Sequence, residues 1–282
     1  MTKLQKTVFS TLFACSSLFG YNFETTFGAH DFIVNDIKTN GVPAHIDDGT
    51  SHTFGANVGI VVKHKTKSNI NLYAKAEVLI DIDTDKLDKD HIPIWFDFIV
   101  DVDGDISKIN DYNFIKWYVY LDDKQNTVSC IERQIRQHLG LGWQFNNQKL
   151  MFALNAYTGF YYIELDDDTP RERGYDRMDL DNGESSSLLE AEASYNFTND
   201  FSIYASASRY SAHAGFSELE TDFKMLLTYK TKDFIAEGTT LNLLLKRNNY
   251  NFNDFNEGHD LSILPWDNDS LVQCFISIPT DF

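Results

Sequence analysis

Twelve segments of this chain alternate apolar and polar residues with a period of two. This is the pattern of β-strands, because successive side chains of a strand point to opposite faces. The clearest segment runs from Asn69 to Ile82, and most segments reach the roughly 9–11 residues that a tilted strand needs to cross a bilayer. The predicted strands are residues 21–34, 53–63, 69–82, 94–102, 112–121, 128–145, 149–165, 187–197, 201–210, 218–229, 234–247 and 271–282.

The length of each connection depends on whether the strand before it is odd-numbered or even-numbered. Short connections follow even-numbered strands, at residues 65–68, 146–148, 198–200 and 230–233, and the longer segment 103–111 falls on the same side. Longer connections follow odd-numbered strands, at residues 36–50, 83–91, 122–126, 166–186, 211–217 and 248–270, of which 122–126 is the weakest case. An even strand count with short turns at one end and long loops at the other is typical of a transmembrane barrel.

We therefore predict an all-β fold over residues 21–282, a transmembrane antiparallel up-and-down β-barrel of about 12 strands. The alternative is an exported soluble β-sandwich or lipocalin-like barrel, which alternates with the same period but buries its apolar face. Alternation alone does not say which face is inside.

The first twenty residues have the features of a secretory signal. Lys3 and Lys6 form a charged start, an apolar core follows, and small residues offer cleavage sites near Gly20. We expect residues 1–20 to be a signal peptide. The stretch Leu12 to Cys15 loosely resembles a lipobox, which makes lipidation of Cys15 the alternative.

The composition narrows the class of partner. The formal net charge is −18, so nucleic acid is an unsuitable partner, because binding it requires clustered basic charge. There is no run of about eighteen apolar residues that would form a transmembrane helix. Cys130 and Cys274 fall on predicted strands far apart in the barrel order, so we expect two free thiols.

The last predicted strand carries a family resemblance. Val272, Cys274, Ile276 and Ile278 share one face with the final residue, Phe282. This run resembles the closing strand of Gram-negative outer-membrane β-barrels. The resemblance implies that Phe282, with Ile278 and Ile276, is an assembly signal read by the barrel-assembly machinery. It also implies a location in the cell outer membrane, with membrane lipid and lipopolysaccharide as partners.

The polar faces of the predicted strands carry charges that we expect to line the lumen, where they must be hydrated or paired. They are Lys75, Glu77, Asp97, Asp101, Lys116, Glu132, Arg136, Glu190, Glu192, Glu220, Asp222, Lys224 and Lys246. A paired network would fill the barrel, whereas an excess of acids would favour cations in a water-filled pore.

Other candidate chemistry is weak. The acids at 166–168 and those from Asp81 to Asp90 are candidate ligands for a divalent cation. They lack EF-hand spacing, so we expect these segments to be solvated loops. His213 near Ser211, and His259 beside Asp260, have no surrounding catalytic motif. We expect no catalytic, metal or cofactor site, and a monomer that is not an enzyme.

Twelve strands and the closing strand together resemble the translocator barrel of autotransporters. The resemblance spans the whole chain after the signal, at the level of architecture. Strand one begins almost directly after the signal, so the chain looks like the solitary autotransporter-type barrel group, which lacks a passenger. This implies a structural, surface-interaction or transport role, and the alternative is a small cation-leaning porin-like channel.

Overall fold

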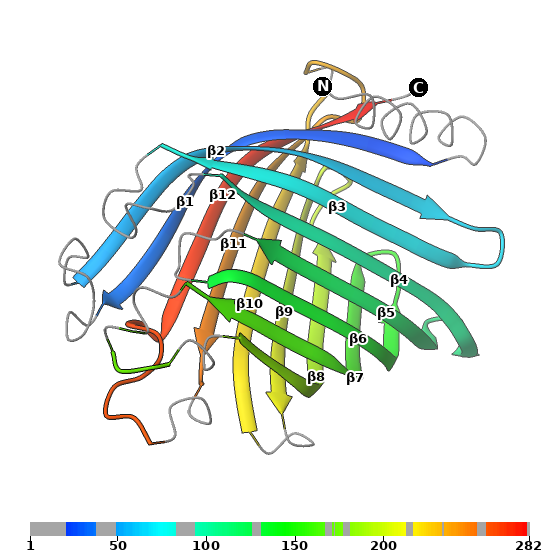
Figure 1. Cartoon of the computed structure of the whole chain (residues 1–282). Coiled ribbons are helices and arrows are strands. Elements are labelled where there is room, and N and C mark those ends of the chain that lie inside the picture. The colour runs from blue at the N-terminus through cyan, green and yellow to red at the C-terminus, as the bar shows by residue number, and fades with distance from the viewer. Residues whose placement is uncertain are drawn as a thin grey trace, which may run out of the picture.

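The chain forms one closed antiparallel β-barrel in which every strand pairs with its sequence neighbours (Figure 1). The computed structural model describes residues 21–37, 49–82, 94–125, 131–166, 171, 173–176, 181–212, 217–232, 234–252 and 258–280. The strands are β1 Asn22–Ile37, β2 Gly49–Lys65, β3 Ile70–Asp81, β4 Ile94–Asn110, β5 Asn113–Gln125, β6 Ile131–Asn146, β7 Leu150–Leu165, β8 Asp181–Asn196, β9 Phe201–Ala212, β10 Ser217–Lys230, β11 Thr240–Tyr250 and β12 Asn268–Thr280. The predicted fold class is confirmed.

The barrel closes where β1 pairs with β12, over a register from Phe23↔Thr280 to Val34↔Asp269. The strands of one wall, β2 to β6, cross those of the opposite wall, β9 to β12, at a steep angle (Figure 1). No helix in the described residues is long and apolar enough to cross a membrane. The predicted signal peptide lies outside the described residues, as does Cys130. Cys274 is a free, exposed thiol on the outer face.

Most strands differ from their predicted bounds by a few residues, and the differences are largest at β4, β8, which begins at Asp181 instead of residue 187, and β11. Residues 103–111 were expected to form a connection, but β4 continues to Asn110 and meets β5 through Asp111 and Tyr112. The Asn110 side chain makes this turn possible, because its Oδ1 accepts hydrogen bonds from the backbone N–H groups of Tyr112 and Asn113, both at 3.0 Å. Strand β11 starts at Thr240, later than predicted, because Ile235 and Gly238 adopt positive φ angles in a turn.

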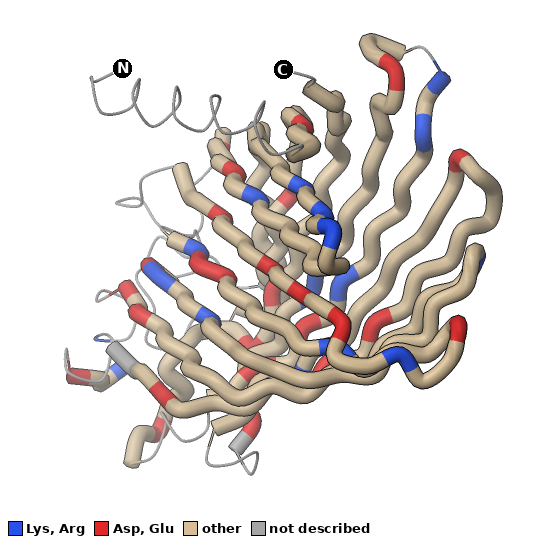
Figure 2. Tube along the Cα trace, turned by 90° about the vertical axis from the view of Figure 1, so that its right-hand side faces the viewer, with Lys and Arg blue, Asp and Glu red and all other residues tan. Residues whose placement is uncertain are grey.

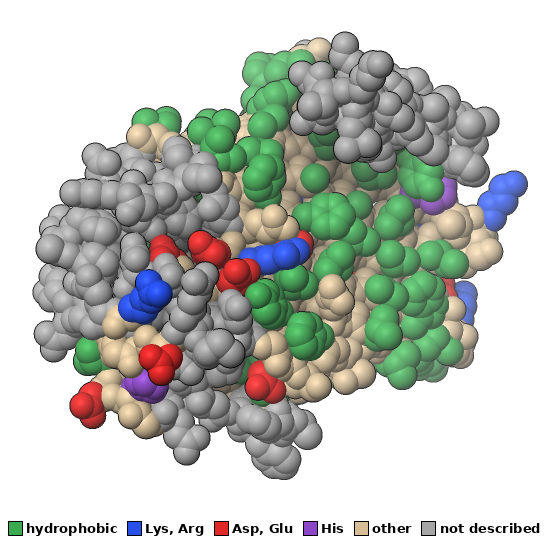
Figure 3. Space-filling model, in the orientation of Figure 1, with side chains coloured by type: hydrophobic (Ala, Val, Ile, Leu, Met, Phe, Trp, Pro, Cys, Tyr) green, Lys and Arg blue, Asp and Glu red, His purple; other side chains and the backbone are tan. Residues whose placement is uncertain are grey.

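The outer face of the barrel is apolar and the inner face is polar. Large apolar side chains are exposed on the outside, including Phe54 at 56% and Leu139 at 61%, while polar residues on the alternate positions are buried. Figure 3 shows hydrophobic side chains gathered over the strands, and Figure 2 shows charged residues distributed along the strands. A soluble barrel buries its apolar face, so this arrangement excludes that alternative and is the one that a bilayer requires.

A hydrophobic core lies inside the end of the barrel that carries the long connections. It combines inward side chains such as Phe32, Trp95 and Ile163 with residues of the segment between β11 and β12. Of that segment, Ile263, Leu264 and Trp266 are buried. The barrel interior is therefore apolar at this end and charged further in.

Candidate functional site

The central feature of the lumen is Arg136, a buried side chain of β6 that reaches the opposite wall. Its Nη1 lies 2.7 Å from Asp222 Oδ2 and its Nη2 lies 2.9 Å from Glu220 Oε1, both on β10. Asp122 on β5 lies 3.5 Å away. Strands β7, β8 and β9 separate β6 from β10, so the pairs with Asp222 and Glu220 cross the lumen, whereas the pair with Asp122 joins adjacent strands. One cation is thus shared among three carboxylates.

Neutral groups complete the Arg136 cluster. Gln134 Oε1 accepts a hydrogen bond from Arg136 (2.8 Å), and Tyr161 donates one to Glu220 (2.8 Å). The guanidinium also lies over the ring of Tyr210, 4.7 Å from its centroid. Hydrogen bonds to both partners are what a buried ion pair needs to offset the loss of hydration.

A second cluster crosses the lumen between β4 and β11. Lys246 Nζ of β11 donates to Asp97 Oδ2 of β4 at 3.4 Å, and Lys75 Nζ lies 4.0 Å from the same oxygen. Lys75 also donates to Glu77 Oε2 (2.6 Å), which accepts a further bond from Gln273 (3.1 Å). Here two lysines meet two carboxylates, so the charges of this cluster balance.

A small cavity lies between the two clusters. It has a volume of about 30 Å³, and the charged residues that line it include Asp97, Lys124, Lys246 and Asp269. A water needs about 10–15 Å³ of such volume, so this cavity admits water but no larger solute.

A third cluster is acidic and only partly buried. Glu190 and Glu192 of β8 face the lumen and accept hydrogen bonds from Tyr157 (2.9 Å) and Tyr204 (2.8 Å). Asp101 of β4 is close enough to both glutamates to interact with them electrostatically. We call Asp101, Glu190 and Glu192 the acidic wall. Unlike the acids of the Arg136 cluster and of the Lys246 cluster, none of these three forms an ion pair with a lysine or arginine among the described residues.

Two lysines lie near the acidic wall, but neither forms an ion pair with Asp101, Glu190 or Glu192 among the described residues. Lys116 forms its ion pair with Asp103, a further acid of β4. Lys224 lies 5.5 Å from the ring centroid of Tyr204 and, among the described residues, has no carboxylate within ion-pair distance. The local charge of this part of the lumen is therefore set by acids held through tyrosine and asparagine hydrogen bonds.

The long-connection end is capped by the segment between β11 and β12, which we call the cap (described at residues 251–252 and 258–267). Arg173 Nε donates to the Ser262 carbonyl (2.5 Å), and Tyr175 OH donates to that of Leu261 (2.8 Å). Tyr175 also stacks on His259, with ring centroids 3.9 Å apart. Because Arg173 and Tyr175 belong to the β7–β8 connection, two connections hold each other over the mouth.

Twelve of the thirteen predicted lumen charges lie on the inner face. The exception is Glu132, which is exposed beside a register shift between Ile131 and Arg133, so that Ile131 takes the buried position. A β-bulge of this kind inserts one residue and reverses the alternation that precedes it. Ile276 and Ile278 lie on the outer face of β12 as predicted, and Phe282 lies outside the described residues, as do His213 and Asp83–Asp90.

The alternation did not indicate two buried polar pairs. His30 Nε2 lies 2.7 Å from Asp81 Oδ1, and His138 Nε2 lies 2.7 Å from Ser186 Oγ. The space for the His30 ring comes from Gly55, where an added Cβ would lie 2.4 Å from the ring. The alternation indicates that each of these residues faces inward, but it does not tell which residues meet across strands. Among the described residues, no group of His, Cys, Asp and Glu is arranged to hold a metal ion.

Several solved porin structures are similar to the chain. The chain is similar to the NanC porin (TM-score 0.49, 9% identity, covering 90% of this chain and 98% of that one). It is also similar to the KdgM porin in complex with disordered oligogalacturonate (0.45, 10%, 91% and 99%) and to an anion-selective porin from Comamonas acidovorans (0.41, 8%, 92% and 99%). No family model matches the chain, and no curated protein matches it.

The location of the protein follows from its surfaces. Only a closed barrel or a helix satisfies all backbone hydrogen bonds inside a bilayer, and this chain is a closed barrel with an apolar exterior. Closed antiparallel barrels of even strand number with such an exterior are outer-membrane proteins. The protein is an outer-membrane β-barrel.

Proposed function

We propose that this protein is a small, cation-preferring channel of the outer membrane, held here in a closed conformation. The observation that carries the proposal is the acidic wall, where the carboxyl groups of Asp101, Glu190 and Glu192 face the lumen and, among the described residues, form no ion pair with a lysine or arginine. Unbalanced carboxylates that line a water-filled pore concentrate cations and repel anions. The substrate class is small cations rather than sugars or anions.

The wall is built to keep its charge in place. Each glutamate is fixed by donors from neighbouring strands, since Asn155 donates to Glu192 at 2.7 Å and Tyr157 donates to Glu190 at 2.9 Å. Carboxylates held by several donors remain oriented without a bound cation. A transient cation can therefore replace water at the wall without rearranging the strands.

Opening requires three changes. The cap must leave the mouth, the pair Lys246–Asp97 must separate or shift, and the pairs of Arg136 with Glu220 and Asp222 must do the same to widen the lumen. None of these changes breaks strand pairing, because the cap lies in a connection and the ion pairs involve side chains alone. The barrel can therefore open while its wall stays intact.

A structural barrel is the second candidate. The cross-lumen ion pairs of Arg136 and the apolar cap favour a filled, non-conducting lumen, as expected for a solitary autotransporter-type barrel with a surface-interaction role. In that case the acidic wall has no transport role. The two candidates differ in a single measurable property, the conductance of the folded protein.

The test is single-channel recording of the refolded mature protein in a planar bilayer under a salt gradient. We expect brief steps whose reversal potential indicates cation preference. The double substitution Glu190→Gln and Glu192→Gln should lower the cation-to-anion permeability ratio by at least about twofold. Asp111→Asn, in the exposed β4–β5 turn, is the matched control and should leave the ratio unchanged.

Stable insertion of folded protein without conductance, including in a variant with a disrupted cap, would favour the structural barrel. Conductance with an unchanged permeability ratio in the double variant would remove the acidic wall from the explanation.

A further inference from the structure

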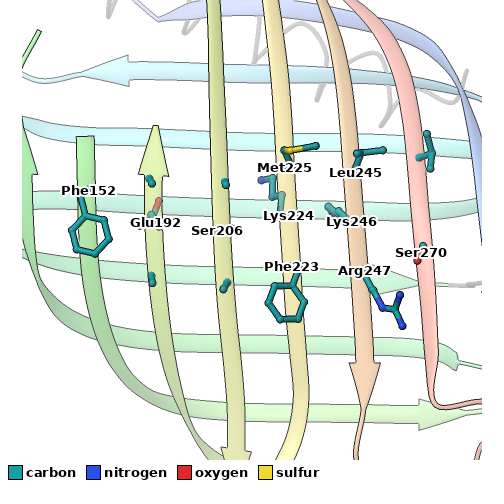
Figure 4. A pocket seen from close by; sticks show the side chains of 15 residues that line it. Phe152, Glu192, Ser206, Phe223, Lys224, Met225, Leu245, Lys246, Arg247 and Ser270 are labelled. Carbon is teal, nitrogen blue, oxygen red and sulfur yellow. The ribbon is translucent and has the colours of Figure 1, made fainter. Parts of the chain in front are cut away.

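The lipid-facing side of the barrel has a groove over β8 and β9, which we call the outer groove (Figure 4). It has a volume of about 600 Å³ and adjoins a second hollow of about 510 Å³, which shares Ala191, Ala207 and Phe223 with it. Ligand sites in proteins typically measure roughly 300–1,000 Å³. The outer groove is thus large enough to hold part of a ligand, such as a lipid chain, and not only a water molecule.

The groove follows from the strand register. Its floor consists of small outward residues that lie opposite one another, Ala191↔Ala207 and Ala193↔Ala205. Its walls are large outward side chains of the flanking strands, Phe152 of β7 and Phe223 and Met225 of β10, of which Figure 4 shows all three. Two small pairs between rows of large residues make a channel that runs along the strands.

The end of the groove toward the long connections is positively charged. Arg247 directly follows the lipid-facing run Leu241, Leu243 and Leu245 on β11, and Figure 4 shows it beside Phe223. Its Nε donates to Asn249 Oδ1 (3.1 Å), and among the described residues it forms no ion pair with a carboxylate. A second outward arginine, Arg209 of β9, borders the adjoining hollow and is half-exposed beside Glu218 (3.2 Å).

An exposed arginine that, among the described residues, has no carboxylate partner can bind an anion of the membrane. Guanidinium groups bind phosphate through paired hydrogen bonds, and a lipid phosphate lies at the boundary where the apolar band of the barrel ends. The groove continues from this cation toward the middle of the band. The groove thus has a cation at the membrane boundary and an apolar channel below it, an arrangement that fits a lipid with a phosphate head and an acyl chain.

We propose that the outer groove binds one lipid A molecule of the outer leaflet, with an acyl chain on the alanine floor and a phosphate on Arg247. The long connections, and therefore Arg247, lie at the outer end of the barrel, where the phosphorylated lipid of the leaflet is lipid A. A second copy of this chain fits less well, because a symmetric contact over the groove would bring positively charged Arg247 side chains together.

The experiment measures lipid retained by the whole folded barrel. The mature protein is refolded in zwitterionic detergent, titrated with purified lipid A, and observed by native mass spectrometry. We expect one bound lipid A on the wild type. Arg247→Gln should weaken binding by about tenfold, the loss expected for a charge-assisted hydrogen bond. The pair Ala205→Leu and Ala207→Leu should weaken it at least as much by filling the floor.

Two matched controls leave the outer groove unchanged. Ala76→Leu adds the same side chain at an exposed alanine of β3, and Lys108→Gln removes a cation from the opposite end of the barrel. Both should bind lipid A as the wild type does. Heat-modifiable migration in gels confirms folding of each variant, and Arg247→Gln keeps the test valid if the leucine pair fails to fold.

Three outcomes would overturn the proposal. Equal retention of phosphatidylglycerol would show a general phosphate contact in place of a lipid A site. Undiminished lipid A binding by both groove variants would place the lipid elsewhere. A dimer that disappears in the leucine pair, without lipid loss, would identify a second copy as the occupant.

Discussion

At the scale of single residues, Arg136 is the central cation of the lumen, with three ion pairs. It is 2% exposed and forms ion pairs with Glu220, Asp222 and Asp122, of which Glu220 is fully buried. Arg136→Met keeps an unbranched apolar stem but removes the ion-pair partner of these carboxylates. Removing one partner of a buried ion pair typically costs about 3–5 kcal/mol, and we expect a loss of that size in the free energy of unfolding.

Urea unfolding of the detergent-folded protein, followed by tryptophan fluorescence, measures this loss. Arg133→Gln is the control, because Arg133 pairs with Asp123 on the outer face with 42% of its side chain exposed. Exposed pairs contribute about 0–1 kcal/mol, so the control should unfold near the wild type. Equal effects of the two substitutions would show that the lumen around Arg136 is hydrated rather than closed.

The same residue shows what sequence can predict about a lumen. Parity placed Arg136, Glu220 and Asp222 on the inner face, and they lie there. It did not predict that they meet, because more than eighty residues and three strands separate Arg136 from its β10 partners. Such contacts depend on which strands face each other across the lumen, which no local pattern encodes. Glu132 was wrongly predicted to face the lumen for a local reason, because a bulge beside it reversed the alternation.

At the scale of elements, the cap decides whether the mouth is closed. Trp266 is 1% exposed within the apolar core of the cap, so Trp266→Ala should destabilise the cap by about 3–5 kcal/mol. If the protein conducts, this variant should open more often than the wild type in planar bilayers. Trp143→Ala, on the outer face of β6, should leave the open probability unchanged. Fewer openings in Trp266→Ala would show that the cap does not gate the lumen.

The cap was the element that sequence analysis missed. Residues 248–270 were predicted as an outside loop, yet the apolar run Ile263, Leu264, Pro265 and Trp266 is buried in the structure. Four consecutive apolar or proline residues inside an acidic loop were the available signal. The strands themselves were predictable because their period-two pattern is local. The errors at β4 and β11 arose where turn residues, rather than alternation, set the boundary.

At the scale of the whole molecule, the barrel depends on closure between its first and last strands. Ala29 of β1 lies directly opposite the native Cys274 of β12, and both are exposed on the outer face. Directly paired residues have Cα atoms about 4.5–5.5 Å apart, within the roughly 4.4–6.8 Å that a disulfide bridges. Ala29→Cys should therefore crosslink to Cys274 under mild oxidation, in a Cys130→Ser background.

Mass spectrometry of unreduced proteolytic fragments detects the crosslink, which would join the two ends of the described barrel. Ala56→Cys is the control, because Ala56 pairs with Ala29 on its other side and lies two strands from Cys274. Two strand spacings amount to about 10 Å, too far for a disulfide. Closure predicts that Ala29→Cys crosslinks and Ala56→Cys does not. An open sheet would leave both unlinked, and a seam slipped by two residues would move the crosslink from Ala29 to Phe27 or Asp31.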